Sequence, residues 1–78
     1  RVYIAVIHYA GTEAADNIVR ALGRIKFVVK SKTMRGENTE MAVEVFCNDP
    51  NVEFADRVRA VEGVQDVTLI QYNGEYHG

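Results

Sequence analysis

The 78-residue sequence has one cysteine, one proline, no tryptophan and no strong excess of either charge. The lone thiol, Cys47, cannot form an internal disulfide or a multi-thiolate metal site, and it favours a reducing compartment. The net charge of −2 provides no broad positive field to attract nucleic acid or anionic lipid. We therefore expect no metal, no cofactor and no nucleic-acid partner.

Long apolar runs are also missing. The longest, Val2–Ile7, is far shorter than the roughly 20 residues that span a bilayer. There is no signal-peptide pattern. The length predicts a single domain, residues 1–78, with a thin core of the kind that often gains stability by oligomerising. Because the first residue is Arg1, we expect a piece of a larger protein or a processed form.

Two segments have the apolar spacing of amphipathic helices. The first follows a break at Ala10-Gly11, with Thr12 as the expected N-cap and Gly23 as the stop. The second is expected to start at Asp49-Pro50-Asn51, because proline is tolerated in a first turn, and to end at Gly63.

Four other segments have strand patterns. Residues 2–9 are apolar on both parities, as in a central strand covered on both faces. Residues 25–34 and 39–48 alternate around a glycine-containing turn, which predicts a hairpin. A last strand runs from Val64 to Tyr72, before an expected turn at Asn73-Gly74 and a loose tail.

Residue parity assigns the hairpin side chains to two faces. Lys30 and Lys32 share a parity, and an even register would set them opposite Glu40 and Glu44. Cys47 has the parity of the apolar residues in its strand, so we expect a buried, unreactive thiol. The basic patch is expected to be a charged edge strand that resists aggregation rather than a nucleic-acid site; its members are Lys26, Lys30, Lys32 and Arg35.

The order strand–helix–strand–strand–helix–strand predicts an α+β fold, a ferredoxin-like βαββαβ sandwich. Its four-stranded antiparallel sheet would carry two helices on one face. Right-handed crossovers would place the first and third strands in the centre.

Two segments resemble ACT domains: the first loop, His8-Tyr9-Ala10-Gly11-Thr12, and the closing segment that begins at Val61-Glu62-Gly63-Val64. The resemblance implies a non-catalytic regulatory domain that forms homodimers. It also implies binding of an amino acid or another small anionic ligand where the first loop meets a neighbouring subunit. Gly11 matches the loop glycine of the family, whereas the acidic residue and proline that typically precede it are replaced. The candidate ligand-binding residues are His8, Tyr9, Gly11 and Thr12.

A second resemblance involves Lys30–Met34, Val61–Val64 and Tyr72–Tyr76. These segments are similar to the C-terminal, ACT-like cytoplasmic tail of bacterial multi-pass membrane proteins of unknown function. This resemblance implies a cytoplasmic location at a membrane and a membrane-embedded segment in the parent chain. It leaves open a structural dimerisation tail with no ligand.

Simpler interpretations stand beside the candidate ligand site. Gly11-Thr12 could offer free backbone N–H groups to an anion, or it could be an ordinary capped turn. His8 and Tyr9 could bind a ligand or simply pack at the end of a strand. Acylphosphatases share the predicted topology, and their first loop carries a catalytic arginine. The first loop of this sequence has no arginine. We therefore expect that this protein is not an enzyme.

Two helices can cover only one face of the sheet. The other face would keep Phe46, a tyrosine and several aliphatic side chains, which on a monomer mark an interaction surface. We expect a dimer through this face or through an edge strand. The candidate interface residues are Val28, Lys30, Lys32, Phe46 and Tyr72.

Overall fold

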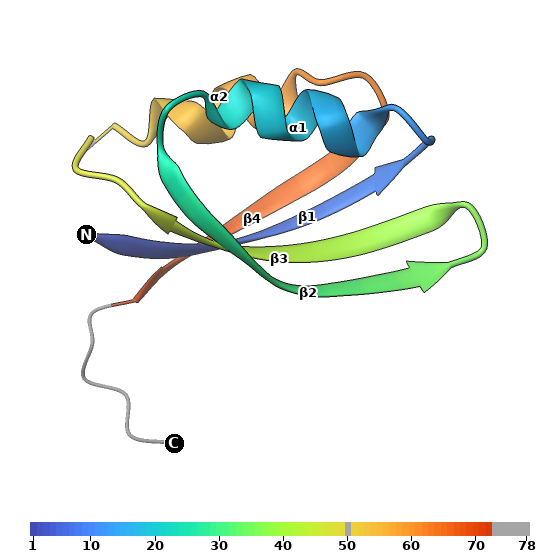
Figure 1. Ribbon diagram of the computed structural model, residues 1–78, viewed down its shortest axis with the longest axis horizontal. Helices are drawn as coiled ribbons and strands as arrows, with labels where there is room; N and C mark the ends of the chain where they lie inside the picture. Colours follow the sequence, from blue (N-terminus) through green and yellow to red (C-terminus); the bar gives the residue numbers. More distant parts are fainter. Residues whose placement is uncertain (50, 73–78) are drawn as a thin grey trace.

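The computed structural model describes residues 1–49 and 51–72, so Pro50 and the turn and tail expected at 73–78 lie outside the described residues. The elements follow the predicted order (Figure 1). They are β1 (Val2–Ala10), α1 (Ala14–Leu22), β2 (Lys26–Arg35), β3 (Asn38–Phe46), α2 (Glu53–Arg59) and β4 (Val64–Tyr72).

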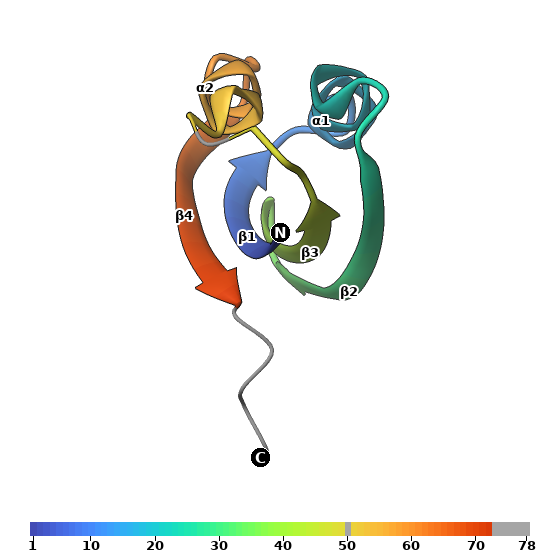
Figure 2. The same cartoon turned by 90° about the vertical axis from the view of Figure 1, so that its left-hand side faces the viewer.

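The four strands form one sheet in the order β2-β3-β1-β4, and every neighbouring pair is antiparallel. Both helices lie side by side over one face of this sheet, and the other face carries no helix (Figure 2). The predicted ferredoxin-like sandwich, with its first and third strands in the centre, is confirmed.

The core lies between the sheet and the helices, and alternation along β1 shows why. Every second residue from Tyr3 to Tyr9 is buried, while the residues between them are partly exposed. The helices add side chains at helical spacing, such as Ile18 and Leu22 of α1, which are 0% and 1% exposed. Tyr3 and Phe54 pack with ring centroids 6.3 Å apart. Each large apolar side chain buried in this way contributes about 1.5–3 kcal/mol.

Both helices begin later than the sequence predicts. Thr12 is not the N-cap of α1: Glu13 holds that position, and no side chain caps the helix. The positive φ of Gly11, 103°, turns the chain, and residues 12–13 form a turn before helical geometry begins. At α2 the carboxylate of Asp49 accepts hydrogen bonds from the N–H groups of Asn51 and Glu53, at 2.9 and 3.1 Å. This turn delays the helix to Glu53.

The two glycine stops have different outcomes. Gly23 is the C-cap of α1, with φ 68° and its N–H donated to the carbonyl of Arg20, as predicted. Gly63 does not end α2, because the helix stops at Arg59 with Ala60 as its C-cap. Gly63 instead lies in the turn before β4, where its carbonyl accepts a hydrogen bond from the N–H of Ala10 at 2.9 Å.

A β-bulge in β2 changes which side chains of the hairpin lie on each face of the sheet, so the assignment predicted from parity holds only before the bulge. Val29 pairs with Val43, but Ser31 pairs with Ala42, so Lys30 is an extra residue on its strand. The shift moves every later side chain of β2 to the opposite face. The expected lysine–glutamate pairs are therefore wrong: Val28 lies opposite Glu44, and Thr33 lies opposite Glu40.

Two further expectations concern burial and membrane insertion. Cys47 is free and buried, with 8% of its surface exposed, as predicted; its low reactivity stays a prediction. Within residues 1–49 and 51–72, neither helix has the length and apolar character needed to span a membrane.

Candidate functional site

A hollow of about 450 Å³ lies between the first loop and the β2–β3 hairpin. The loop side exists because Gly11, with its positive φ, turns the chain from β1 into α1. The hairpin side exists because β2 and β3 continue past Met41 to their turn. The lining residues are Tyr9, Gly11, Thr12 and Ala15 on the first side, and Lys32, Met34, Gly36, Glu37 and Thr39 on the second.

The hollow brings together three of the four candidate ligand-binding residues. Tyr9, Gly11 and Thr12 line it, whereas His8 does not. Successive side chains of a strand point to opposite faces, so Tyr9 lies on the helix side of β1 and His8 on the helix-free side.

Lys32 is a lining residue that parity reasoning assigned to the wrong face. The bulge at Lys30 places it opposite Met41, on the helix side of the sheet, where it lines the hollow together with the first loop. Glu37 adds a carboxylate from the hairpin turn. Nothing in the sequence signals this bulge, since the segment contains no glycine. The hollow thus combines one cation, one anion, two threonine hydroxyls and the apolar surface of Met34.

The N-terminus of α1 faces a separate hollow whose lining is acidic. Gly11, Thr12 and Asn17 line it together with Glu13 and Glu62. Two carboxylates beside the free N–H groups repel an incoming anion. This geometry favours the ordinary turn over an anion site at the helix end.

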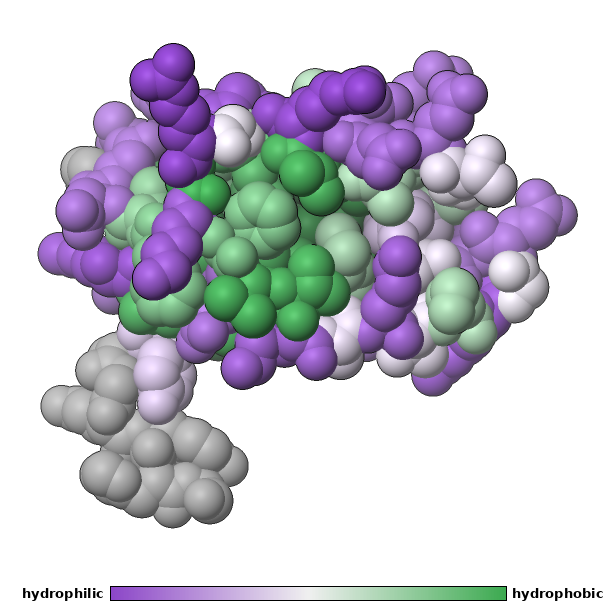
Figure 3. Space-filling view, viewed as in Figure 1, coloured by the Kyte–Doolittle hydropathy of each residue, from purple (hydrophilic) through white to green (hydrophobic). Residues whose placement is uncertain are grey.

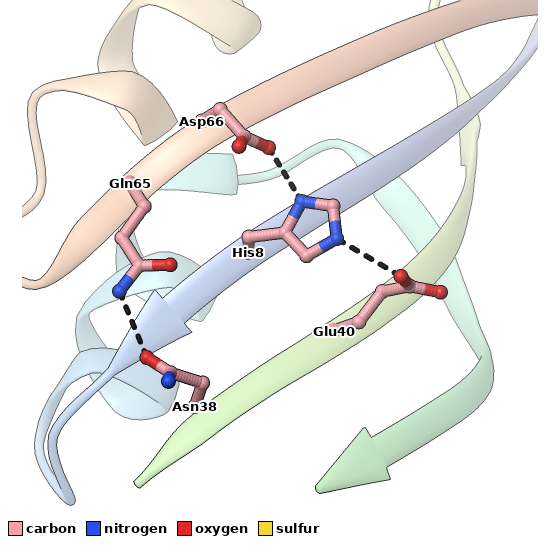
Figure 4. A network of polar contacts seen from close by, with 5 residues as sticks. All are labelled: His8, Asn38, Glu40, Gln65 and Asp66. Atoms are coloured by element: carbon pink, nitrogen blue, oxygen red, sulfur yellow. Dashed lines mark hydrogen bonds and ion pairs between the residues drawn. The ribbon is translucent and has the colours of Figure 1, made fainter. Parts of the chain in front are cut away.

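His8 belongs to a polar cluster on the helix-free face (Figure 4). Its Nδ1 lies 2.5 Å from Oδ1 of Asp66 on β4, and its Nε2 lies 2.9 Å from Oε1 of Glu40 on β3. Both carboxylates are direct cross-strand neighbours of the ring. Beside the cluster, Gln65 donates from Nε2 to Oδ1 of Asn38 at 2.9 Å.

The two carboxylates determine the chemistry of His8. Their hydrogen bonds, first Asp66 and then Glu40, raise the pKa of His8 above its ordinary value of 6.5. In the protonated ring both nitrogens donate, so neither offers a lone pair to a substrate proton or a metal ion. In the part of the chain that the structure describes, no three His, Cys, Asp or Glu side chains are placed to hold a metal.

The candidate interface residues also divide between surfaces. Val28, Phe46 and Tyr72 lie on the helix-free face, on three different strands. Lys32 lies on the opposite face, and Lys30 is the bulged residue. The strand that carries Val28 and both lysines, β2, is an edge strand, as predicted.

No protein-family model and no curated protein sequence matches the chain. Among solved structures it is similar to the ACT domain of GTP pyrophosphokinase from Chlorobium tepidum. The crystal structure of that domain aligns with a TM-score of 0.70 and 12% identity, over 88% of this chain and 96% of that one. Its solution NMR structure aligns with a TM-score of 0.69 and 12% identity, over 100% and 94%. The chain therefore has the fold of an ACT domain.

Proposed function

We propose that this chain is a non-catalytic regulatory domain that self-associates and binds a small ligand in the hollow beside its first loop. The observation that carries the proposal is that Lys32 and Glu37 of the hairpin both line a hollow whose other side is the first loop. A ligand with both a carboxylate and an amino group, such as a free amino acid, matches these two charges. A purely anionic ligand would use Lys32 alone.

The fold supports a regulatory role. The similar ACT domain is part of a larger enzyme, GTP pyrophosphokinase. The His8 cluster offers no free general base, because both ring nitrogens are engaged. A domain of this kind acts by changing its association or its contacts when ligand binds, since a ligand shifts an equilibrium only by its differential affinity for the two states.

Self-association through the edge strand is supported by an apolar patch beside the hollow. Figure 3 shows apolar side chains gathered on the side of the molecule where α1 and β2 lie in Figure 1. On the helix side of the sheet these elements carry two exposed valines, Val19 of α1 and Val29 of β2, at 44% and 46%. The free edge of β2 can pair with a second copy, and the lysines limit uncontrolled growth. Such a copy would extend the wall of the hollow.

A thermal-shift screen against amino acids and other small anions tests ligand binding. A ligand at about 100 times its Kd adds about 2.7 kcal/mol, which should raise the Tm by about 10 °C or more for a domain of this size. Lys32→Gln should reduce this shift, because it removes the cation. Lys30→Gln is the matched control, since that lysine does not line the hollow. An equal loss in both variants, or in neither, contradicts the assigned site.

The second candidate function is a structural dimerisation tail that binds no ligand. It would lie on the cytoplasmic side of a membrane, joined to a membrane-embedded segment of the parent chain. The apolar helix-free face supports it, as does the similarity of Lys30–Met34 to such tails. A flat ligand screen with retained self-association would favour this candidate. Fractionation of cells that produce the parent chain would test the membrane location: recovery in the soluble fraction contradicts it.

A further inference from the structure

The helix-free face of the sheet changes from apolar to polar along the direction of the strands. Cross-strand pairing places its side chains in rows that run across all four strands. The row through Val2 contains Phe46 and Tyr72, and the next row contains Val28, Ile4 and Ile70. A row of small residues follows, with Ser31, Ala42, Val6 and Thr68, and then the row of Thr33, Glu40, His8 and Asp66. One half of the face is therefore apolar, and the other half is polar.

The apolar half exposes side chains from all four strands. Its most exposed members are Ile70 at 52%, Val28 at 44%, Tyr72 at 37% and Phe46 at 36%. The partly exposed Val2, Ile4, Val6 and Ala42 join them into one contiguous apolar patch. On a monomer, a contiguous patch of this kind marks an interaction surface.

The charges on the apolar half favour a second copy as the occupant. It carries one cation, Lys26, and one anion, Glu44, so it is neutral as a whole. The Lys26 ammonium lies over the Phe46 ring, 5.3 Å from its centre, as a cation–π contact within the patch. A neutral patch with one charge of each sign can meet its own copy without net repulsion, whereas a strongly acidic or basic partner would find no complementary field.

The polar half restricts how two copies can pack. The His8 cluster places two carboxylates around one imidazole ring, so its net charge is negative whether or not the ring is protonated. Two clusters placed face to face would repel each other. Overlap of the apolar halves alone leaves the clusters at opposite ends of the pair, in contact with water. Its internal ion pairs also leave the cluster little to offer an oppositely charged partner.

From these observations we infer that the helix-free face docks the same face of a second copy of this chain, through the apolar half and away from His8. The contact is isologous, as in most homodimers. It shares with the proposed function only the premise that the domain self-associates, and it adds a surface separate from the β2 edge. Where both surfaces are used, more than two copies assemble.

Sedimentation velocity at micromolar concentration tests the inference with two matched variants. Ile70→Glu places a charge in the apolar half, and Val29→Glu places the same charge at the β2 edge, at 52% and 46% exposed positions. We expect Ile70→Glu to lower the mass of the assembly at least twofold. Val29→Glu should leave at least a pair. Circular dichroism confirms folding, and Phe46→Glu is a second variant in the same apolar half.

Each outcome is informative. An unchanged mass in both face variants overturns the inference and leaves edge pairing intact. Single chains in Val29→Glu alone overturn it as well, because the face contact should hold two copies together. A wild-type mass of 8.7 kDa overturns self-association altogether, while the thermal-shift screen still decides ligand binding. Loss of mass in Ile70→Glu with a normal ligand response supports the inference alone.

Discussion

At the scale of single residues, His8 illustrates how sheet pairing creates chemistry that no short motif encodes. Asp66 and Glu40 are 58 and 32 residues away in sequence, yet both reach the ring. The ring is 37% exposed, so water screens these contacts. Their main effect is on the protonation equilibrium of His8, because two neighbouring carboxylates stabilise the imidazolium relative to the neutral ring.

This cluster predicts a pH dependence of stability. The folded-state pKa of His8 is raised above 6.5, so the folded protein binds the proton more tightly than the unfolded chain. Its stabilising contribution is therefore complete below pH 6.5 and is lost as the pH rises through the folded-state pKa. Urea unfolding of wild type and His8→Gln across this range measures the difference. The two free energies of unfolding should converge at high pH; divergence with rising pH contradicts the assignment.

At the scale of elements, the turn after α2 shows how closely β1, α1 and β4 approach. A Cβ added at Gly63 would lie 2.4 Å from the carbonyl oxygen of Ala10 and 3.3 Å from the Cβ of Ala14. The backbone at Ala10 cannot move away easily, because Ala10 pairs with Asn38 of β3 and donates its N–H to the carbonyl of Gly63. Glycine is thus required here by packing as well as by its φ of 95°.

Gly63→Ala should destabilise the domain more than a conformational cost alone. Gly11 is the matched control, since its φ of 103° is similar but an added Cβ would meet nothing within 4 Å. Gly11→Ala should cost about 1–2 kcal/mol for the left-handed backbone. Gly63→Ala should cost about 1–3 kcal/mol more because of the clash. Denaturant midpoints measure both, and equal losses would contradict the proposed close approach.

At the scale of the whole molecule, the buried side chains of the sheet and of both helices form one continuous core layer. Cys47 lies in this layer at the end of β3, where its sulfur accepts a hydrogen bond from the N–H of Asp49 at 3.3 Å. A reagent can reach the thiol only when the layer opens.

Labelling of Cys47 should therefore be slow in native buffer and should accelerate in parallel with unfolding. The thiolate is the reactive form, and burial keeps the reagent from it. The control is Asp56→Cys in a Cys47→Ala background, because the Asp56 side chain is 76% exposed on α2, away from the helix-free face and the β2 edge. That variant should react at once with a thiol reagent. Rapid, complete labelling of native wild type would show that the core is open at this end.

Local patterns in the sequence determined the type and order of the elements and the burial of Cys47. These features depend on periods of two and 3.6 residues, which are properties of each segment alone. The right-handedness of crossover connections then predicted which strands lie at the centre of the sheet. Glycine and proline signals placed the ends of elements less well. Turns that precede each helix, at Thr12 and around Asp49 and Asn51, delayed the start of α1 and α2.

Only the tertiary structure decided the make-up of the candidate site. Lys32 reaches the first-loop hollow because one residue of β2 bulges against β3, and a bulge is set by the register of two strands rather than by either sequence. His8 leaves that hollow and meets Asp66 and Glu40 because β1 is paired on both sides. Side-chain alternation is local, whereas cross-strand neighbours depend on how distant segments align.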